Sequence, residues 1–391
     1  MSEIKVNSIK GVGASAAAIT VNNSDGTCRA NITNNLSNRN LIINGAMEVA
    51  QRGTSSTLAG YYTVDRFKFE TGGVDENCTQ AQVDVASGTT PYTAGFRKAF
   101  KITNGNQTSG AGAGDRIIIN YFIEAQDIAS SGWNYTDPNS FITLSFYVKS
   151  SVAQTFYVRL ESKDGTRSSY PLSTGSLSAD TWTKVTHSVP GHGSLLQFDN
   201  DNAAGLQIEF TLYRGTNNTS NSVTLNAWGA YDSAARIPDV TTTWFTTNDA
   251  TFELTGVQLE VGSVATDFEH RSFAVEKRLC MRYFQKYVNI GASGFVPDNT
   301  SKSYAHVFYW PVEFRATPTA TATNTGSSNG QYIGDGDNTV NISSLDASSH
   351  TTQICEMYFV LTGDLTNFRG AYPSSSDSST FQTTFSFNAE L

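Results

Sequence analysis

Hydrophobic and polar residues alternate most clearly near residue 252. Phe252, Leu254, Val257, Leu259 and Val261 are interleaved with small or polar residues. This period-two pattern is typical of a β-strand with one buried face. The segment therefore predicts a strand that closes a β domain.

A helix is predicted directly after a polar turn over residues 262–270. Ser272 occupies an N-cap position and Glu276 lies in the first turn, where an acidic side chain favours a helix start. Apolar residues then recur at helical spacing on one stripe: Leu279, Cys280, Tyr283, Phe284 and Tyr287. We expect a short helix over 272–287 that leads out of the β domain.

Short strands fill the chain upstream of this helix. Leu144, Phe146 and Val148 alternate with Thr143, Ser145 and Tyr147, which places the first set inside and the second outside. Ten or so strands without helical periods between them predict a two-sheet jelly roll over 41–271. The expected segments are 41–45, 62–69, 80–86, 96–103, 116–124, 141–150, 155–162, 182–189, 206–214, 223–228 and the strand from 251.

The two ends of the chain differ from this central domain. Residues 288–391 show roughly five strand patterns and predict a small C-terminal β-sandwich domain. Residues 1–40 contain too few large apolar residues to fold alone and form a leader, which is disordered or is ordered by a partner or by other copies of the chain. The fold class is therefore all-β: a jelly-roll sandwich, a short connecting helix and a C-terminal β domain.

Composition supports the all-β class and excludes several partners. Charged residues make up 16% of the 391 residues and the net charge is −9, without a long basic run. This argues against nucleic acid and against an anionic membrane surface, and no apolar segment is long enough to span a bilayer or to serve as a signal peptide. Four well-separated cysteines, Cys28, Cys78, Cys280 and Cys355, predict free thiols in a reducing compartment.

Motifs for catalysis are missing from the sequence. It contains no GxSxG elbow, HExxH pair or Walker loop, and its five histidines are scattered. No carboxylate pair stands out for glycoside hydrolysis. We predict that the chain is not an enzyme and assign no catalytic residue.

Sugar binding fits the aromatic loops better, because a sugar ring stacks on an indole or phenol while polar side chains bond its hydroxyls. Trp133 and Tyr135 rank highest as surface residues, because Gly132 and Pro138 bracket them in a loop. Trp182 and Trp228 end strands, and we expect them in the core. The predicted ligand-binding residues are Trp133, Tyr135, Asp137, Tyr231 and Trp244.

Several stretches resemble tail-fibre and other virion surface proteins of tailed bacteriophages. The most specific is Gly256-Val-Gln-Leu-Glu-Val-Gly262, which continues through Ala265-Thr-Asp-Phe-Glu-His-Arg271 to Cys280-Met-Arg-Tyr-Phe284. Further matching stretches are 40–47, Gln51-Arg-Gly53, 62–67, 144–149, 311–318 and Phe387-Asn-Ala-Glu-Leu391. The resemblance implies a homotrimeric virion component that is assembled in the host cytoplasm and has a carbohydrate-binding jelly roll.

The resemblance also bears on metal and on the helix. Many such modules hold a structural calcium between an Asn-Gly-x-x-Glu turn, here Asn44 to Glu48, and paired aspartates, whose position Thr255-Gly256 occupies. We therefore predict no cofactor and assign no metal ligands. The helix stripe either packs on its own domain or brings Leu279, Tyr283 and Tyr287 of three copies together.

These observations favour a phage tail fibre or virion surface protein. Residues 1–40 would bind other virion proteins, and the jelly roll would recognise host surface polysaccharide without chemistry. The alternative is a structural subunit, such as a neck fibre or capsid decoration, that binds other virion proteins. A glycan-degrading enzyme ranks third.

Overall fold

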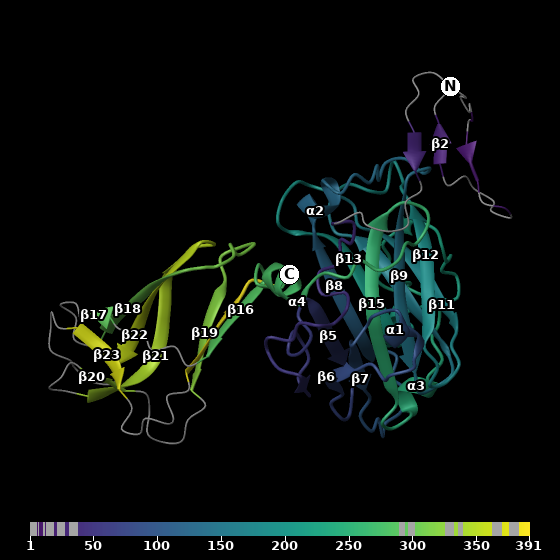
Figure 1. Cartoon of the computed structure of the whole chain (residues 1–391). Helices are drawn as coiled ribbons and strands as arrows, with labels where there is room; N and C mark the ends of the chain where they lie inside the picture. The colour runs from purple at the N-terminus through teal and green to yellow at the C-terminus, as the bar shows by residue number, and fades with distance from the viewer. Residues whose placement is uncertain are drawn as a thin grey trace.

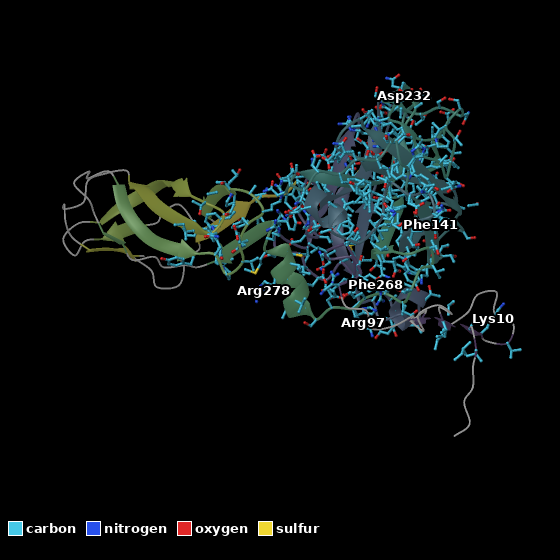
Figure 2. The ribbon with its side chains drawn as sticks, turned by 90° about the horizontal axis from the view of Figure 1, so that it is seen from above. Lys10, Arg97, Phe141, Asp232, Phe268 and Arg278 are labelled. Carbon is cyan, nitrogen blue, oxygen red and sulfur yellow. The ribbon has the colours of Figure 1, made fainter. Side chains whose placement is uncertain are left out.

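A computed structural model describes residues 6, 8–10, 12, 19–21, 28–30, 38–288, 294–295, 302–324, 332–334, 339–361, 370–374 and 383–391. Figures 1 and 2 show a large β-sandwich with a smaller β domain extending to one side of it. A three-stranded sheet of β1 (Ser8–Ile9), β2 (Ile19–Val21) and β3 (Cys28–Ala30) lies apart from the sandwich in both views.

The sandwich consists of two six-stranded antiparallel sheets. The first, called the β13 sheet, has the order β14 (Gly229–Ala230), β11 (Ser168–Ser176), β10 (Thr155–Ser162), β13 (Ala204–Arg214), β8 (Arg116–Glu124) and β5 (Phe67–Gly72). The second, called the β15 sheet, has the order β12 (Thr183–Pro190), β9 (Phe141–Ser150), β15 (Thr251–Val261), β7 (Lys98–Thr103), β6 (Thr79–Asp84) and β4 (Ser55–Ser56). Their facing side chains form one hydrophobic core. The all-β class and the jelly-roll sandwich are confirmed.

Strand β15 contains a bulge that explains its sequence pattern. Thr255 pairs with Tyr147 of β9, but the next pair is Gln258 with Ser145, so β15 has one extra residue there. Gly256 takes φ +63° at this point, a conformation that favours glycine. The bulge is why Leu254 and Val257 both face the core although three positions separate them.

The connecting helix is shorter than predicted. Helix α4 spans Phe273–Cys280 with Ser272 as N-cap, and the chain then turns into strand β16, Phe284–Val288. Ala389 N donates to Tyr283 O at 2.8 Å, and β16 pairs with β24, Thr383–Asn388. These tertiary hydrogen bonds outweigh the helical spacing of the apolar residues. The other helices in the described part of the chain are single turns: α1 (Thr90–Thr93), α2 (Ala125–Ala129), α3 (Thr243–Thr246) and η1 (Thr216–Asn218).

Three strand predictions need correction. Residues 41–45 and 223–228 form turns and extended loops, whereas β11 was not predicted. Segment 41–45 runs beside β15 through isolated backbone bonds, Leu41 N to Leu259 O and Val257 N to Gly45 O, each 2.9 Å long. β11 is rich in serine and contains Pro171, yet it pairs with β10 and β14 on its two sides, so its neighbours rather than its residues determine the strand.

The C-terminal domain has more than the five strands expected. A three-stranded sheet contains β16, β24 and β19 (Thr319–Asn324). The other strands hydrogen-bond in a closed ring: β17 (Gly294–Phe295), β18 (Lys302–Tyr309), β22 (Ile354–Leu361), β21 (Thr339–His350), β20 (Tyr332–Gly334) and β23 (Gly370–Ser374).

The end of the chain is seated in the jelly roll by a buried polar cluster, the C-terminal seat, made of Arg52, Arg66, Glu124, Tyr283 and Glu390. Arg66 bonds Glu390 and its guanidinium lies 3.4 Å from the ring centre of Tyr283. The Tyr283 hydroxyl donates to Glu124 at 2.6 Å, and Arg52 lies 3.4 Å from Glu390. Four stretches of the family resemblance, 51–53, 62–67, 280–284 and 387–391, therefore meet in one structural cluster.

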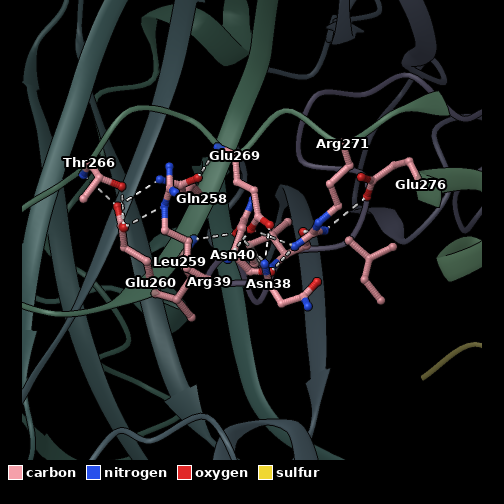
Figure 3. A network of polar contacts seen from close by, with 12 residues as sticks. Asn38, Arg39, Asn40, Gln258, Leu259, Glu260, Thr266, Glu269, Arg271 and Glu276 are labelled. Atoms are coloured by element: carbon pink, nitrogen blue, oxygen red, sulfur yellow. Dashed lines mark hydrogen bonds and ion pairs between the residues drawn. The ribbon is translucent and has the colours of Figure 1, made fainter. Parts of the chain in front are cut away.

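The most specific stretch of the resemblance forms a second polar cluster, the clasp (Figure 3). Glu260 accepts from Thr266 N at 2.8 Å, and Gln258 Oε1 accepts from Glu269 N at 2.8 Å. Glu269 in turn accepts from Asn40 N at 2.8 Å, and Arg271 donates to Asn40 O at 2.5 Å. This stretch therefore ties the start of the jelly roll to its last strand.

Cys78 and Cys280 are buried free thiols, as predicted for these two. Within the described ranges, none of the helices is long and apolar enough to cross a membrane.

Candidate functional site

A groove of about 320 Å³ lies on the outer face of the β15 sheet. Its floor comes from β9, β12 and the β15 bulge, and its walls come from the segments around residues 94–96 and 266–270. We call it the aromatic groove. It is lined by Ala94, Phe96, Ser145, Tyr147, Lys184, Gly256, Thr266, Asp267, Phe268 and His270.

The bulge in β15 makes room for the central ring of this groove. Phe96 packs edge-on against Phe268 with ring centres 4.8 Å apart, and 5.6 Å from Tyr147. A Cβ on Gly256 would lie 2.6 Å from the Phe96 ring. The glycine therefore serves both the backbone conformation of the bulge and the position of Phe96.

Four half-buried aromatic residues surround a small apolar cluster on this face. Tyr92, Tyr147, Trp182 and Phe268 pack against Val85, Phe96 and Ala99, and all four rings keep part of their surface exposed. Figure 2 shows Phe268 and Arg97 on one side of the sandwich and Asp232 on another. The β15 sheet thus presents a ring-lined surface on its outer face.

Polar groups with free bonding capacity lie between these rings. Lys184 Nζ is 5.9 Å from the Tyr147 ring centre. Within the described residues, neither the Asp267 carboxylate nor the Lys184 ammonium has a hydrogen-bond or ion-pair partner. Burial and the Asp267 charge raise the pKa of Tyr147, so its hydroxyl remains a neutral donor and acceptor. The groove can stack a ring and bond its hydroxyls.

A smaller cleft of about 240 Å³ lies where β14 and β11 end the β13 sheet. Trp228 and Arg236 line it together with Ser169, Pro171 and residues 222–224. The Trp228 indole donates to Pro190 O at 2.7 Å, which fixes its orientation. We call this the Trp228 cleft.

Two predicted ligand-binding residues are buried and need correction. Trp133 is 3% exposed, and its Nε1 donates to Ser140 O at 3.2 Å, so the loop folds the ring inward over the core. Trp244 is 0% exposed and donates to Thr251 O at 3.1 Å. Neither indole offers a face to a sugar.

The other three predicted residues are half-buried but are not gathered into one site. Tyr135 packs edge-on against Phe198, and the Asp137 carboxylate accepts from Asn139 N at 2.9 Å to hold its own turn. The Arg167 guanidinium covers one face of Tyr231 at 3.9 Å. Figure 1 places α2, just before the Trp133 loop, and α3, which contains Trp244, at opposite ends of the sandwich.

The tryptophans expected in the core are the ones that reach the surface. Trp182 directly precedes β12 and is half-buried, packed on the same apolar cluster as Tyr147. Trp228 lines the Trp228 cleft. One signal for the groove was present in the sequence, since the alternation in β9 places Tyr147 outside.

The predicted oligomer residues have different environments. Tyr283 is 1% exposed and bonds Glu124 within its own chain, so it cannot meet a partner. Tyr287 lies in β16 beside Trp310, and Leu279 on α4 is half-buried. The three residues share no helical face, because the helix ends at Cys280.

The Asn44–Glu48 turn lies against the β15 bulge, where Val257 N donates to Gly45 O at 2.9 Å. A Cβ on Gly45 would lie 2.0 Å from Val257 O, so only glycine fits there. The Asn44 amide donates to Val49 O at 2.8 Å and to Asp65 O at 2.9 Å. Among the described residues, no group of three or more His, Cys, Asp or Glu could hold a metal ion.

Comparisons with known proteins give weak structural likenesses. No family model and no curated protein matches the chain. The enzymatically active domain of tailspike protein 4 of bacteriophage CBA120 has 10% identity and a TM-score of 0.30, over 57% of this chain and 21% of that chain. A family 11 carbohydrate-binding module from Clostridium thermocellum, in complex with a β-1,3-1,4-mixed-linked tetrasaccharide, has 12% identity and a TM-score of 0.24, over 56% and 98%.

A tandem pair of CBM22 domains from Paenibacillus barcinonensis has 8% identity and a TM-score of 0.27, over 92% of this chain and 100% of that chain. This chain spans about a fifth of the tailspike it resembles. At such identities and scores, function must be argued from the chain's own residues.

Proposed function

We propose that this chain is a surface protein of a tailed-phage particle and that its jelly roll binds host-cell glycan, without catalysis, in the aromatic groove. The observation that carries the binding role is the two half-buried rings of Tyr147 and Phe268 that line the groove beside Asp267 and Lys184, whose charged groups have no hydrogen-bond or ion-pair partner among the described residues. Rings supply stacking area and the charged groups supply hydrogen bonds to hydroxyls, which is the chemistry that a sugar requires.

Binding without hydrolysis is supported by the lining of the groove. Asp267 is the single carboxylate among its lining residues, whereas glycoside hydrolysis by the common route uses two carboxyl groups that flank the bond. The virion role is supported by the sequence resemblance, whose motif residues form the C-terminal seat and the clasp. We retain residues 1–40 as the proposed attachment segment and a homotrimer as the proposed assembly, which sedimentation of the purified chain would test.

The test compares glycan binding by the full chain and by Tyr147→Ala/Phe268→Ala, which removes two rings that line the groove. Loss of both rings should weaken binding about tenfold or more, since each aromatic contact contributes roughly 0.5–1.5 kcal/mol. Tyr309→Ala is the matched control, because this ring is 79% exposed and lies in the C-terminal domain. A glycan array supplies the probe, and cells that display the recognised glycan then serve for an adsorption assay.

Two results would change the assignment. If the double variant folds and binds glycan as well as the wild type, the aromatic groove is not the site. If the folded wild type binds no glycan and does not compete with phage adsorption, the chain is a structural subunit of the particle.

A further inference from the structure

A cluster of charges covers the outer face of the β13 sheet beside the Trp228 cleft. Arg159 bonds Glu161 and Glu209, with Nη2 to Glu209 Oε2 at 2.8 Å, and Arg214 bonds Glu209 at 2.8 Å. All four side chains are about 1% exposed. Lys163 and Arg167 add two more cations on Glu161.

Arg236 is the fifth cation of this region and differs from the other four. It lies 5.4 Å from the ring of Tyr231, which Arg159 and Arg167 also approach. Its Nε donates to Ser233 O at 3.3 Å, but within the described residues it has no carboxylate partner and its two terminal nitrogens have no acceptor. The nearby Asp232 carboxylate accepts from Ala234 N instead.

The electrostatic surroundings of Arg236 favour the binding of an anion. Two carboxylates serve the four paired cations, so cations outnumber carboxylates in the cluster beside Arg236, where the Glu209 charge only partly offsets those of Arg214 and Arg159. Burial and the neighbouring Arg214 charge lower the pKa of Arg236, although a guanidinium remains charged at any physiological pH. A half-buried cation of this kind is stabilised when an anion binds in front of it.

The cleft beside Arg236 has the other groups that a sugar needs. Ser169 and Pro171 of β11 pair with Glu161 and Arg159 of β10, so the cleft adjoins the charge cluster directly. The half-buried Trp228 ring forms an apolar wall, held by Tyr170 at 5.2 Å and by its hydrogen bond to Pro190. Ser169, Ser222 and Thr224 contribute hydroxyls.

We propose that the Trp228 cleft is a second glycan site, specific for a sugar that carries a carboxylate, with Arg236 binding the carboxylate and Trp228 stacking on the ring. A guanidinium matches a carboxylate through two parallel hydrogen bonds. This site lies on the other sheet from the aromatic groove and is independent of it. A site with this specificity implies that the ligand of the chain is an acidic polysaccharide.

The experiment measures binding of the full chain to oligosaccharides that contain hexuronic or nonulosonic acids and to their carboxyl-reduced forms. We expect at least tenfold preference for an acid over its reduced form, and loss of that preference in Arg236→Gln. Arg236→Lys should recover only part of it, because an ammonium lacks the paired donors. Arg278→Gln, which removes the same charge from an exposed position of α4, should bind as the wild type does.

Thermal unfolding of each variant confirms that the fold is intact. Three results would overturn the proposal. The wild type could bind acids and their reduced forms equally, it could bind no acidic probe, or Arg236→Gln could keep the preference for the acid. Binding of sulfated but not carboxylated probes would overturn the carboxylate assignment. A failure of the proposed function of the aromatic groove is detected separately. In that case Tyr147→Ala would bind neutral probes as well as the wild type does.

Discussion

Arg66 and Arg236 show how the same side chain serves structure in one region and is available for a ligand in another. Arg66 is 1% exposed, bonds Glu390 and lies between the rings of Tyr121 and Tyr283. Arg236 is half-buried, borders a cleft and has no carboxylate partner in the described part of the chain. In the C-terminal seat, Glu390 of the same chain supplies the counter-charge of Arg66. In the Trp228 cleft, a bound ligand can supply the counter-charge of Arg236.

This contrast concerns the pairing of side chains rather than membership of a family motif. Many motif residues bond one another in the seat and the clasp. The aromatic groove, however, is also lined by motif residues, among them Gly256, Asp267 and Phe268, whereas the Trp228 cleft is lined by residues outside the motifs. Incomplete pairing of charged side chains, and not motif membership, therefore marks the surfaces that can bind.

The largest effect should come from Glu390→Gln. This change leaves the Arg66 charge buried without its anion, and breaking a buried pair costs about 3–5 kcal/mol. Denaturant unfolding should show a loss of at least about 3 kcal/mol, and limited proteolysis should release the C-terminal domain earlier. Arg236→Gln is the comparison variant and should change stability by less than about 1 kcal/mol.

If Glu390→Gln and Arg236→Gln have similar stabilities, the distinction between a structural and an available arginine fails.

Gly256→Ala should have the next largest effect and connects stability to the aromatic groove. The added Cβ meets the Phe96 ring at 2.6 Å, and the backbone has φ +63°. Strain and overpacking together cost about 2 kcal/mol, and displacement of Phe96 should weaken neutral glycan binding. Unfolding and binding are measured on the same preparation. Gly175→Ala is the control for positive φ, because nothing lies within 4 Å of the Cβ it would add.

Periodicity was sufficient to predict the jelly roll, because inside-outside alternation reports burial on a sheet directly. The irregular spacing between Leu254 and Val257, three positions instead of two, corresponds to the bulge in β15. The end of α4 could not be predicted from the local sequence. Ala389, more than a hundred positions later, donates the backbone hydrogen bond to Tyr283 O at the point where the chain turns into β16. β11 was missed for the same reason: its partners on both sides determine its conformation.

The candidate sites were harder to predict, because exposure depends on how a loop folds back. Trp133 lies in a loop between a glycine and a proline, but its indole bonds Ser140 and turns inward. Trp182 directly precedes β12, yet its ring is only half-buried, because it packs on the small apolar cluster at the outer face of the β15 sheet. Tyr147 was placed outside correctly by alternation, so strand positions were more informative than loop positions.

A smaller effect is expected from the titration of Asp65, which lies beside Arg52 of the seat. Burial raises the pKa of Asp65 to about 7, against the opposing charge of Arg52 and the hydrogen bonds from Gln51. The folded state therefore holds a proton that the unfolded state has lost above its ordinary pKa, and stability falls as pH rises from about 4 to 7. Between pH 6 and 7 the loss should be about 1 kcal/mol. Asp65→Asn should remove it, as unfolding at both pH values would show. Equal slopes for the wild type and the variant would contradict this assignment.

The smallest effect should come from a pair that resembles the seat in chemistry but not in burial. Lys68 Nζ lies 2.9 Å from Glu70 Oε1, and both side chains are about one-third exposed. Water already solvates these charges, so Lys68→Ala, Glu70→Ala and the double variant should give a coupling energy of about 0–1 kcal/mol, which falls further at high salt. A coupling energy as large as the loss in Glu390→Gln would mean that proximity of opposite charges, rather than their burial, stabilises this protein. In that case the lack of a carboxylate partner for Arg236 among the described residues would say little about a ligand, because an exposed anion anywhere nearby could serve it equally well.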